Sequence, residues 1–84
     1  MIDYEVISSR QEAMAAWDKT HVIIREDDGY YFVYPLLGRG YKYPTFDLKR
    51  QCCLNTFLSE QKAIEWAEAR GYKFSILNDS KRRD

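Results

Sequence analysis

The sequence holds few of the residues and patterns that identify a function directly. It has one histidine, two adjacent cysteines and no apolar run near the roughly 20 residues that a transmembrane helix needs. The opening stretch MIDYEVISSR lacks the pattern of a signal peptide. Two adjacent cysteines also do not make the disulfide framework of a small secreted domain. We therefore expect a cytoplasmic protein.

Net charge is missing as well. Thirteen basic and thirteen acidic residues give a formal net charge of zero, so no overall field draws the chain to nucleic acid or to an anionic membrane. The sequence has no glycine-rich phosphate loop, no metal-ligand cluster and no nucleophile elbow. We therefore expect a protein that is not an enzyme, with no catalytic residues, no cofactor and no metal.

Aromatic residues, by contrast, are plentiful. The chain of 84 residues has seven Tyr, four Phe and two Trp. A chain of this length forms one domain with a small core, and each ring can bury roughly 150–250 Å². We predict a single α+β domain over residues 1–78, followed by a frayed charged tail at 79–84.

The best-marked unit runs from Thr56 to Leu77 and reads as strand, helix, strand. Ser59 can cap the N-terminus of a helix over residues 60–70, and Gly71 suits the left-handed residue that ends one. An apolar stripe at helical spacing consists of Ala63, Ile64 and Ala67. After the glycine, apolar residues alternate with polar ones and predict a strand with one buried face: Tyr72, Phe74 and Ile76.

The N-terminal half predicts a strand, a helix and a hairpin. Alternating residues near the N-terminus indicate a short first strand. Ser9 and Glu12 fit the capping box of a helix over residues 10–18. Strands at 21–25 and 30–34 are joined by a turn with Asp28-Gly29, whose residues accept positive φ values. Pro35 is expected to end the second of these strands.

These elements give the order strand, helix, strand, strand, variable segment, helix, strand. This is the βαββαβ order of the ferredoxin-like arrangement. Residues 53–58, at the end of the variable segment, are a candidate for one additional strand. We predict a two-layer α+β sandwich, with an antiparallel sheet of four to five strands and two helices on one face, or a variant with added strands from the 41–58 region. One core cluster is predicted from Trp17, Phe32, Ile64 and Phe74.

The segment 36–51 has no periodic pattern, and its length is unusual for a structureless connection. It concentrates rings and cations, and Tyr and Arg are enriched at protein interfaces. Inward packing of its rings would equally explain an ordered loop. The predicted partner-binding residues are Arg39, Tyr41, Lys42, Tyr43, Phe46, Lys49 and Arg50.

Single-stranded nucleic acid is the alternative partner for this segment. Arg39 to Phe46 partly matches the RNP1 pattern of RNA-recognition motifs, whose aromatic residues stack on bases. Lys42 and Pro44 depart from that pattern, and the segment follows the strand that should carry it. We therefore favour a binding protein that self-associates or contacts another protein, inhibitor- or antitoxin-like and of bacterial or phage type, with no membrane partner.

Cys52, Cys53 and His21 are the remaining residues with reactive side chains. A vicinal disulfide closes a strained ring, and two cysteines without a nearby histidine do not supply the usual four zinc ligands. Free thiols acting as small apolar groups are the expected state. No motif places a nucleophile or carboxylate beside the histidine, so we expect it at a strand end, facing water or half-buried.

Overall fold

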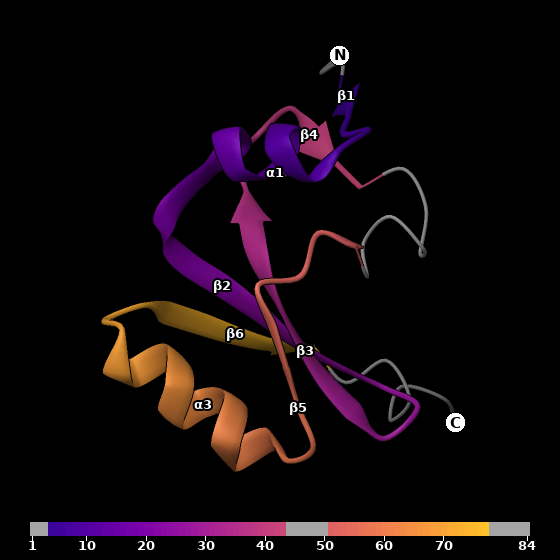
Figure 1. Ribbon diagram of the computed structural model, residues 1–84. Coiled ribbons are helices and arrows are strands. Elements are labelled where there is room, and N and C mark those ends of the chain that lie inside the picture. The colour runs from indigo at the N-terminus through magenta and orange to yellow at the C-terminus, as the bar shows by residue number, and fades with distance from the viewer. Residues whose placement is uncertain (1–3, 44–50, 78–84) are drawn as a thin grey trace.

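The computed structural model describes residues 4–43 and 51–77 (Figure 1). These residues form an α+β fold with two helices, a four-stranded mixed sheet and a small two-stranded parallel sheet, which confirms the α+β part of the predicted fold class. In chain order the elements are β1 (Glu5–Val6), α1 (Arg10–Ala16), β2 (Trp17–Asp27), β3 (Tyr30–Leu37), β4 (Tyr41–Lys42), β5 (Asn55–Phe57), α3 (Glu60–Ala69) and β6 (Lys73–Leu77). The predicted tail at 79–84 lies outside the described residues.

The main sheet has the strand order β5-β3-β2-β6. β3 is antiparallel to both β5 and β2, whereas β2 and β6 are parallel. Consequently β5 and β6 run in the same direction, and α3 is the crossover that carries the chain from one edge of the sheet to the other. The strand-helix-strand unit is confirmed, but the sheet is mixed rather than antiparallel.

The predicted first strand lies outside the main sheet. β1 pairs in parallel with β4, with Glu5 opposite Tyr41 and Val6 opposite Lys42. The order is therefore not strictly ferredoxin-like. α1 leads directly into β2, so β1 stays at the far side of this helix, away from the main sheet (Figure 1). A second, smaller core cluster lies at this end of the molecule. Its three buried residues are Ile7, Ala13 and Cys52.

The hairpin turn has the predicted geometry. Asp28 and Gly29 both have positive φ, 55° and 83°, as a two-residue turn between twisted strands requires.

The strands on either side are longer than predicted, and α1 ends at Ala16. Trp17 takes up extended geometry, pairs with Leu37 and donates its Nε1–H to a backbone carbonyl 2.7 Å away. Burial of this large ring in the sheet ends the helix two residues early.

Pro35 does not end β3, contrary to expectation. It is buried within the strand and pairs with Val22 of β2. β5 accompanies β3 only as far as Val33, so at Pro35 the strand has a neighbour on one side alone. Because a proline has no backbone N–H, it is tolerated in a strand where no neighbouring strand needs that N–H as a hydrogen-bond donor.

The main core lies between α3 and the sheet. Its fully or nearly buried members are Trp17, Val22, Ile24, Val33, Ala63 and Ala67. Ile64 and Phe74 pack against this cluster as predicted. Phe32 does not belong to it. Successive side chains of a strand point to opposite faces, and Val33 occupies the core face of β3, so Phe32 lies on the other face.

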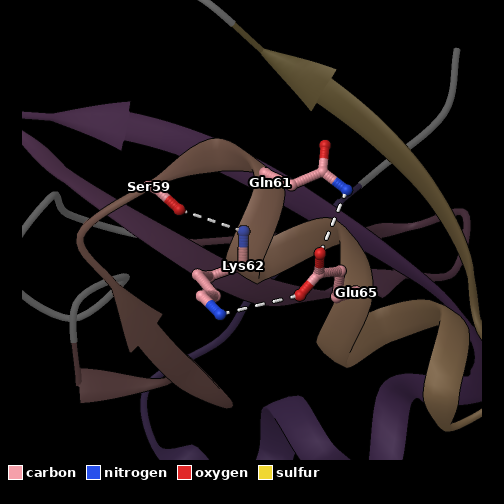
Figure 2. A network of polar contacts seen from close by, with 4 residues as sticks. All are labelled: Ser59, Gln61, Lys62 and Glu65. Atoms are coloured by element: carbon pink, nitrogen blue, oxygen red, sulfur yellow. Dashed lines mark hydrogen bonds and ion pairs between the residues drawn. The ribbon is translucent and has the colours of Figure 1, made fainter.

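Both ends of α3 carry the signals expected from the sequence. Ser59 Oγ accepts the backbone N–H of Lys62 at 3.1 Å (Figure 2). At the other end of the helix, Gly71 has a φ of 79°. In the same figure Glu65 accepts from Gln61 at 3.4 Å and meets the Lys62 ammonium at 3.9 Å. Such exposed contacts contribute little to stability. Neither helix in the described part of the chain is long and apolar enough to cross a membrane.

Replacing Gly71 by valine is expected to destabilise the protein by about 1–3 kcal/mol. Apart from the two adjacent residues of the chain, no described atom lies within 4 Å of the Cβ that such a residue adds, so the cost comes from the left-handed backbone and not from a clash. Gly71→Asn is the matched control, because asparagine tolerates this conformation better. The melting temperature should be highest for wild type, lower for the asparagine variant and lowest for the valine variant. A valine variant with the melting temperature of wild type would contradict the assignment of Gly71 as the left-handed residue that ends α3.

Candidate functional site

A row of aromatic rings follows the face of β3 that points away from α3. The Phe32 ring centroid lies 6.4 Å from that of Tyr30 and 6.2 Å from that of Tyr34. Tyr43, which follows β4, continues the row at 5.9 Å from Tyr34. Each end of this row borders a surface groove, and these two grooves are the candidate sites.

The first, which we call the β4 groove, has a volume of about 320 Å³. It is lined by Ile23, Leu36, Leu37, Tyr41, Lys42 and Tyr43. Ile23 comes from β2 and reaches the groove because it pairs with Tyr34 across the hairpin. The structure thus brings three of the predicted partner-binding residues, Tyr41, Lys42 and Tyr43, together with apolar side chains of the main sheet.

These three residues do not play the same part. Tyr43 is partly buried and donates its hydroxyl to the Pro35 carbonyl at 2.7 Å. Its partly buried ring lines the groove, and its hydroxyl is bonded inward, as the inward-packing explanation requires. Tyr41, 38% exposed, and the exposed Lys42 remain on the surface. Inward packing therefore accounts for Tyr43 but not for Tyr41.

Of the remaining predicted residues, the structure describes only Arg39, which is not among the residues that line the β4 groove. Arg39 is exposed in the turn between β3 and β4. Phe46, Lys49 and Arg50 lie outside the described residues.

Tyr43 should make the stability of the protein depend on alkaline pH. Burial of its hydroxyl raises the pKa of Tyr43 above the usual value of 10.0. The folded state therefore holds the phenolic proton more tightly than the unfolded chain. The contribution of this group to stability is full below about pH 10 and is lost as the pH rises towards the folded pKa.

The test compares wild type with Tyr43→Phe by urea denaturation. At about pH 8 the variant should be less stable by about 0.5–1.5 kcal/mol, because a partly buried hydrogen bond is lost. Above about pH 10 the difference in unfolding free energy between the two proteins should become smaller. Wild type then loses the stabilisation that comes from the raised pKa of Tyr43, and the phenylalanine variant has no such stabilisation to lose. Tyr41→Phe is the control, because the Tyr41 hydroxyl makes no hydrogen bond to any residue that the structure describes. A gap that stays constant with pH would contradict the assignment.

The second groove, the β5 groove, has a volume of about 470 Å³. It is lined by Tyr30, Thr56, Phe57, Leu58, Ser59 and Lys62. Leu58 is 77% exposed and Tyr30 is 47% exposed. The sequence prediction missed this groove, because an apolar residue just before a helix cap is ordinarily explained by packing onto the first turn. Here that side chain projects into solvent instead.

The reactive residues have structural surroundings. Cys52 is fully buried beside Ile7 and Ala13, and burial raises the pKa of its thiol. Both cysteines are free thiols. His21 is partly buried on β2, with its Nε2 2.9 Å from the Ser75 hydroxyl. Over residues 4–43 and 51–77, no group of three His, Cys, Asp or Glu is placed to hold a metal ion.

No protein-family model matches this chain, and no curated protein or solved structure matches it significantly. The function is therefore inferred from the geometry and chemistry of the grooves.

Proposed function

We propose that this protein is a non-enzymatic protein-binding module of the cytoplasm, and that the β4 groove is its binding surface. The observation that carries the proposal is that Tyr41 and Lys42, both exposed, line one groove together with aliphatic and aromatic side chains. The bound protein is expected to insert an apolar side chain and to offer a carboxylate to Lys42.

The composition of the groove supports this proposal. The buried centre of a protein interface is apolar and rich in aromatic residues, and it is surrounded by a polar rim. Here Leu36 and Leu37 supply the apolar centre, while Tyr41 and Lys42 lie at the rim. Lys42 makes no ion pair with any other residue that the structure describes. A carboxylate from a partner would therefore replace water and not an existing salt bridge.

Single-stranded nucleic acid is the second candidate, because the ring row on β3 resembles a stacking platform. Stacking needs accessible ring faces, however. Tyr34 is only 3% exposed and the Tyr43 hydroxyl is held by Pro35, which leaves Tyr30 as the one ring of the row with high exposure. Together with zero net charge, this favours a protein partner. A gel shift with single-stranded DNA at low salt is expected to show no complex.

The proposed partner is a different protein, of the kind that a small inhibitor or antitoxin-like chain engages. Affinity capture from the native host tests this with three forms of the bait. Wild type is compared with a groove variant carrying Tyr41→Ala and Lys42→Glu. The control carries the same two changes at the β5 groove, Tyr30→Ala and Lys62→Glu, where one tyrosine and one lysine are likewise exposed.

A protein that is captured by wild type and the control but lost with the groove variant supports the proposal. Circular dichroism should show all three baits folded, because the substituted side chains are exposed. Loss of capture with the control alone would move the binding surface to the β5 groove. Capture that survives both double variants would contradict a binding site at either groove.

A further inference from the structure

The two edges of the main sheet are protected to very different degrees. β5 forms one edge, has three residues, and its Thr56 N–H already donates to the Asn55 side chain at 2.8 Å. β6 forms the other edge and has five residues, Lys73–Leu77. In the part of the chain that the structure describes, no strand lies on the outer side of β6 and no side chain bonds to its backbone.

An unprotected edge strand is a template for pairing with another strand. The usual protective devices are proline, bulges, inward-pointing charges, very short strands and lysines along the edge. β6 has none of the first four, and its one lysine, Lys73, is the first residue of the strand. Leu77 is also 42% exposed. We propose that β6 is a self-association surface, at which two copies of this chain pair antiparallel across a twofold axis through Ser75.

The sequence of β6 is complementary to itself in this register. Lys73 lies opposite Leu77 of the second copy, Phe74 lies opposite Ile76, and Ser75 lies opposite itself. Lys73 is the only charged residue of the strand, so no like charges face each other. Apolar cross-strand pairs of the Phe–Ile kind stabilise a sheet. A twofold axis also requires that the pairing be antiparallel and self-complementary.

The two faces of the strand agree with this arrangement. Phe74 and Ile76 are only partly buried and lie on the face covered by α3. Pairing would cover their remaining exposed surface and continue the core across the axis. The two copies of α3 would then lie on the same face of one extended sheet, since α3 contacts β6 within each chain (Figure 1).

The electrostatics favour a second copy as the occupant. A chain with zero net charge is not repelled by its own copies, whereas a large net charge keeps proteins apart. A five-residue strand pair covers less surface than the roughly 1,600 Å² of a standard interface. The dimer is therefore expected to form at micromolar concentration and above. It uses a different surface from the β4 groove, so the two proposals stand or fall separately.

Opposite charges at Leu77 test the register directly. Leu77→Glu places a carboxylate opposite Lys73 of the second copy, twice per dimer, whereas Leu77→Lys places cations there. Cross-strand charge pairs of this kind change association by a total of about tenfold. Sedimentation equilibrium at low salt should give a dimer dissociation constant about tenfold higher for the lysine variant than for the glutamate variant, and added salt should reduce the difference.

The matched control places the same two residues at the other edge. Thr56→Glu and Thr56→Lys change an exposed residue of β5 and should leave the dissociation constant of the dimer unchanged. Leu77 also lies opposite Arg25 of the same chain, so a charge at position 77 changes the stability of the monomer as well. Melting temperature measures that change in stability, whereas molecular mass measures association. A wild type that stays monomeric at high micromolar concentration, equal constants for the two Leu77 variants, or sensitivity at Thr56 instead would each overturn the proposal.

A disulfide trap provides a second measurement. Ser75→Cys, in a background with Cys53→Ser, places two thiols at the twofold axis, where opposite Cβ atoms lie about 4.5–5.5 Å apart. Mild oxidation should produce a covalent dimer. Lys73→Cys in the same background should not, because its counterpart lies four residues further along, about 13 Å away. Equal cross-linking of both variants, or none from Ser75→Cys, would overturn this register.

Discussion

Replacing Trp17 by alanine is expected to cost about 3–5 kcal/mol of stability and to leave much of the protein unfolded. The ring is 7% exposed and meets the Tyr72 ring edge-on at a centroid distance of 5.3 Å. Its Nε1–H also donates to the His21 carbonyl at 2.7 Å. The loss is a large share of the ~5–15 kcal/mol typical of a folded protein, and this domain is small.

Urea denaturation followed by circular dichroism measures this loss. Trp17→Phe is the graded control, because it keeps an aromatic ring and removes only the donor and part of the volume. It should fall between wild type and alanine. An alanine variant with the wild-type denaturation midpoint would mean that Trp17 does not join the helix end to the core.

The second large effect is expected at Ile24, and its neighbour provides the control. Ile24 is fully buried between the sheet and α3, so Ile24→Ala should cost about 2–5 kcal/mol. Ile23 points to the opposite face and borders the β4 groove, where it is only partly buried. Ile23→Ala removes the same atoms and should cost distinctly less.

Chemical denaturation of the two alanine variants decides the side-chain assignment of β2. A shift of one residue in the pairing register would exchange the two faces of the strand. Equal losses, or a larger loss at Ile23, would therefore show that the register with β3 and β6 is wrong.

The elements that could be predicted from the sequence are those with local signals. α3 has a serine cap at Ser59 and a glycine at Gly71, and both act through the helix's own backbone. The hairpin turn is fixed by Asp28 and Gly29 for the same reason. The strand after α3 shows clear alternation, because β6 has only one face in contact with the core.

The elements that could not be predicted depend on contacts between distant residues. Pro35 fits within β3 only because β5 stops short of it. The prediction that Phe32 belongs to the core cluster is wrong because Tyr30 to Tyr34 consists of apolar and aromatic residues throughout, so the sequence does not show which residues face the core. The parallel pairing of β6 with β2 follows from the crossover through α3, and no local pattern specifies it.

The candidate site was predicted in part for the same reason. The concentration of rings and cations pointed to Tyr41 and Lys42, which do lie at a groove. It could not separate Tyr43, whose hydroxyl is bonded inward to Pro35, from its exposed neighbours. The sequence does not indicate that Leu58 is exposed, because the exposure of an apolar residue beside a helix cap depends on where the whole segment between β5 and α3 lies.

The central claim, that the β4 groove binds a protein, is tested most directly by the affinity of the captured partner for single variants. Isothermal titration calorimetry should show about tenfold or greater weakening for Tyr41→Ala and for Lys42→Glu, as expected of anchor residues at an interface. Tyr30→Ala and Lys62→Glu should bind as wild type does. Unchanged affinity for both groove variants, with the fold intact, would contradict the claim.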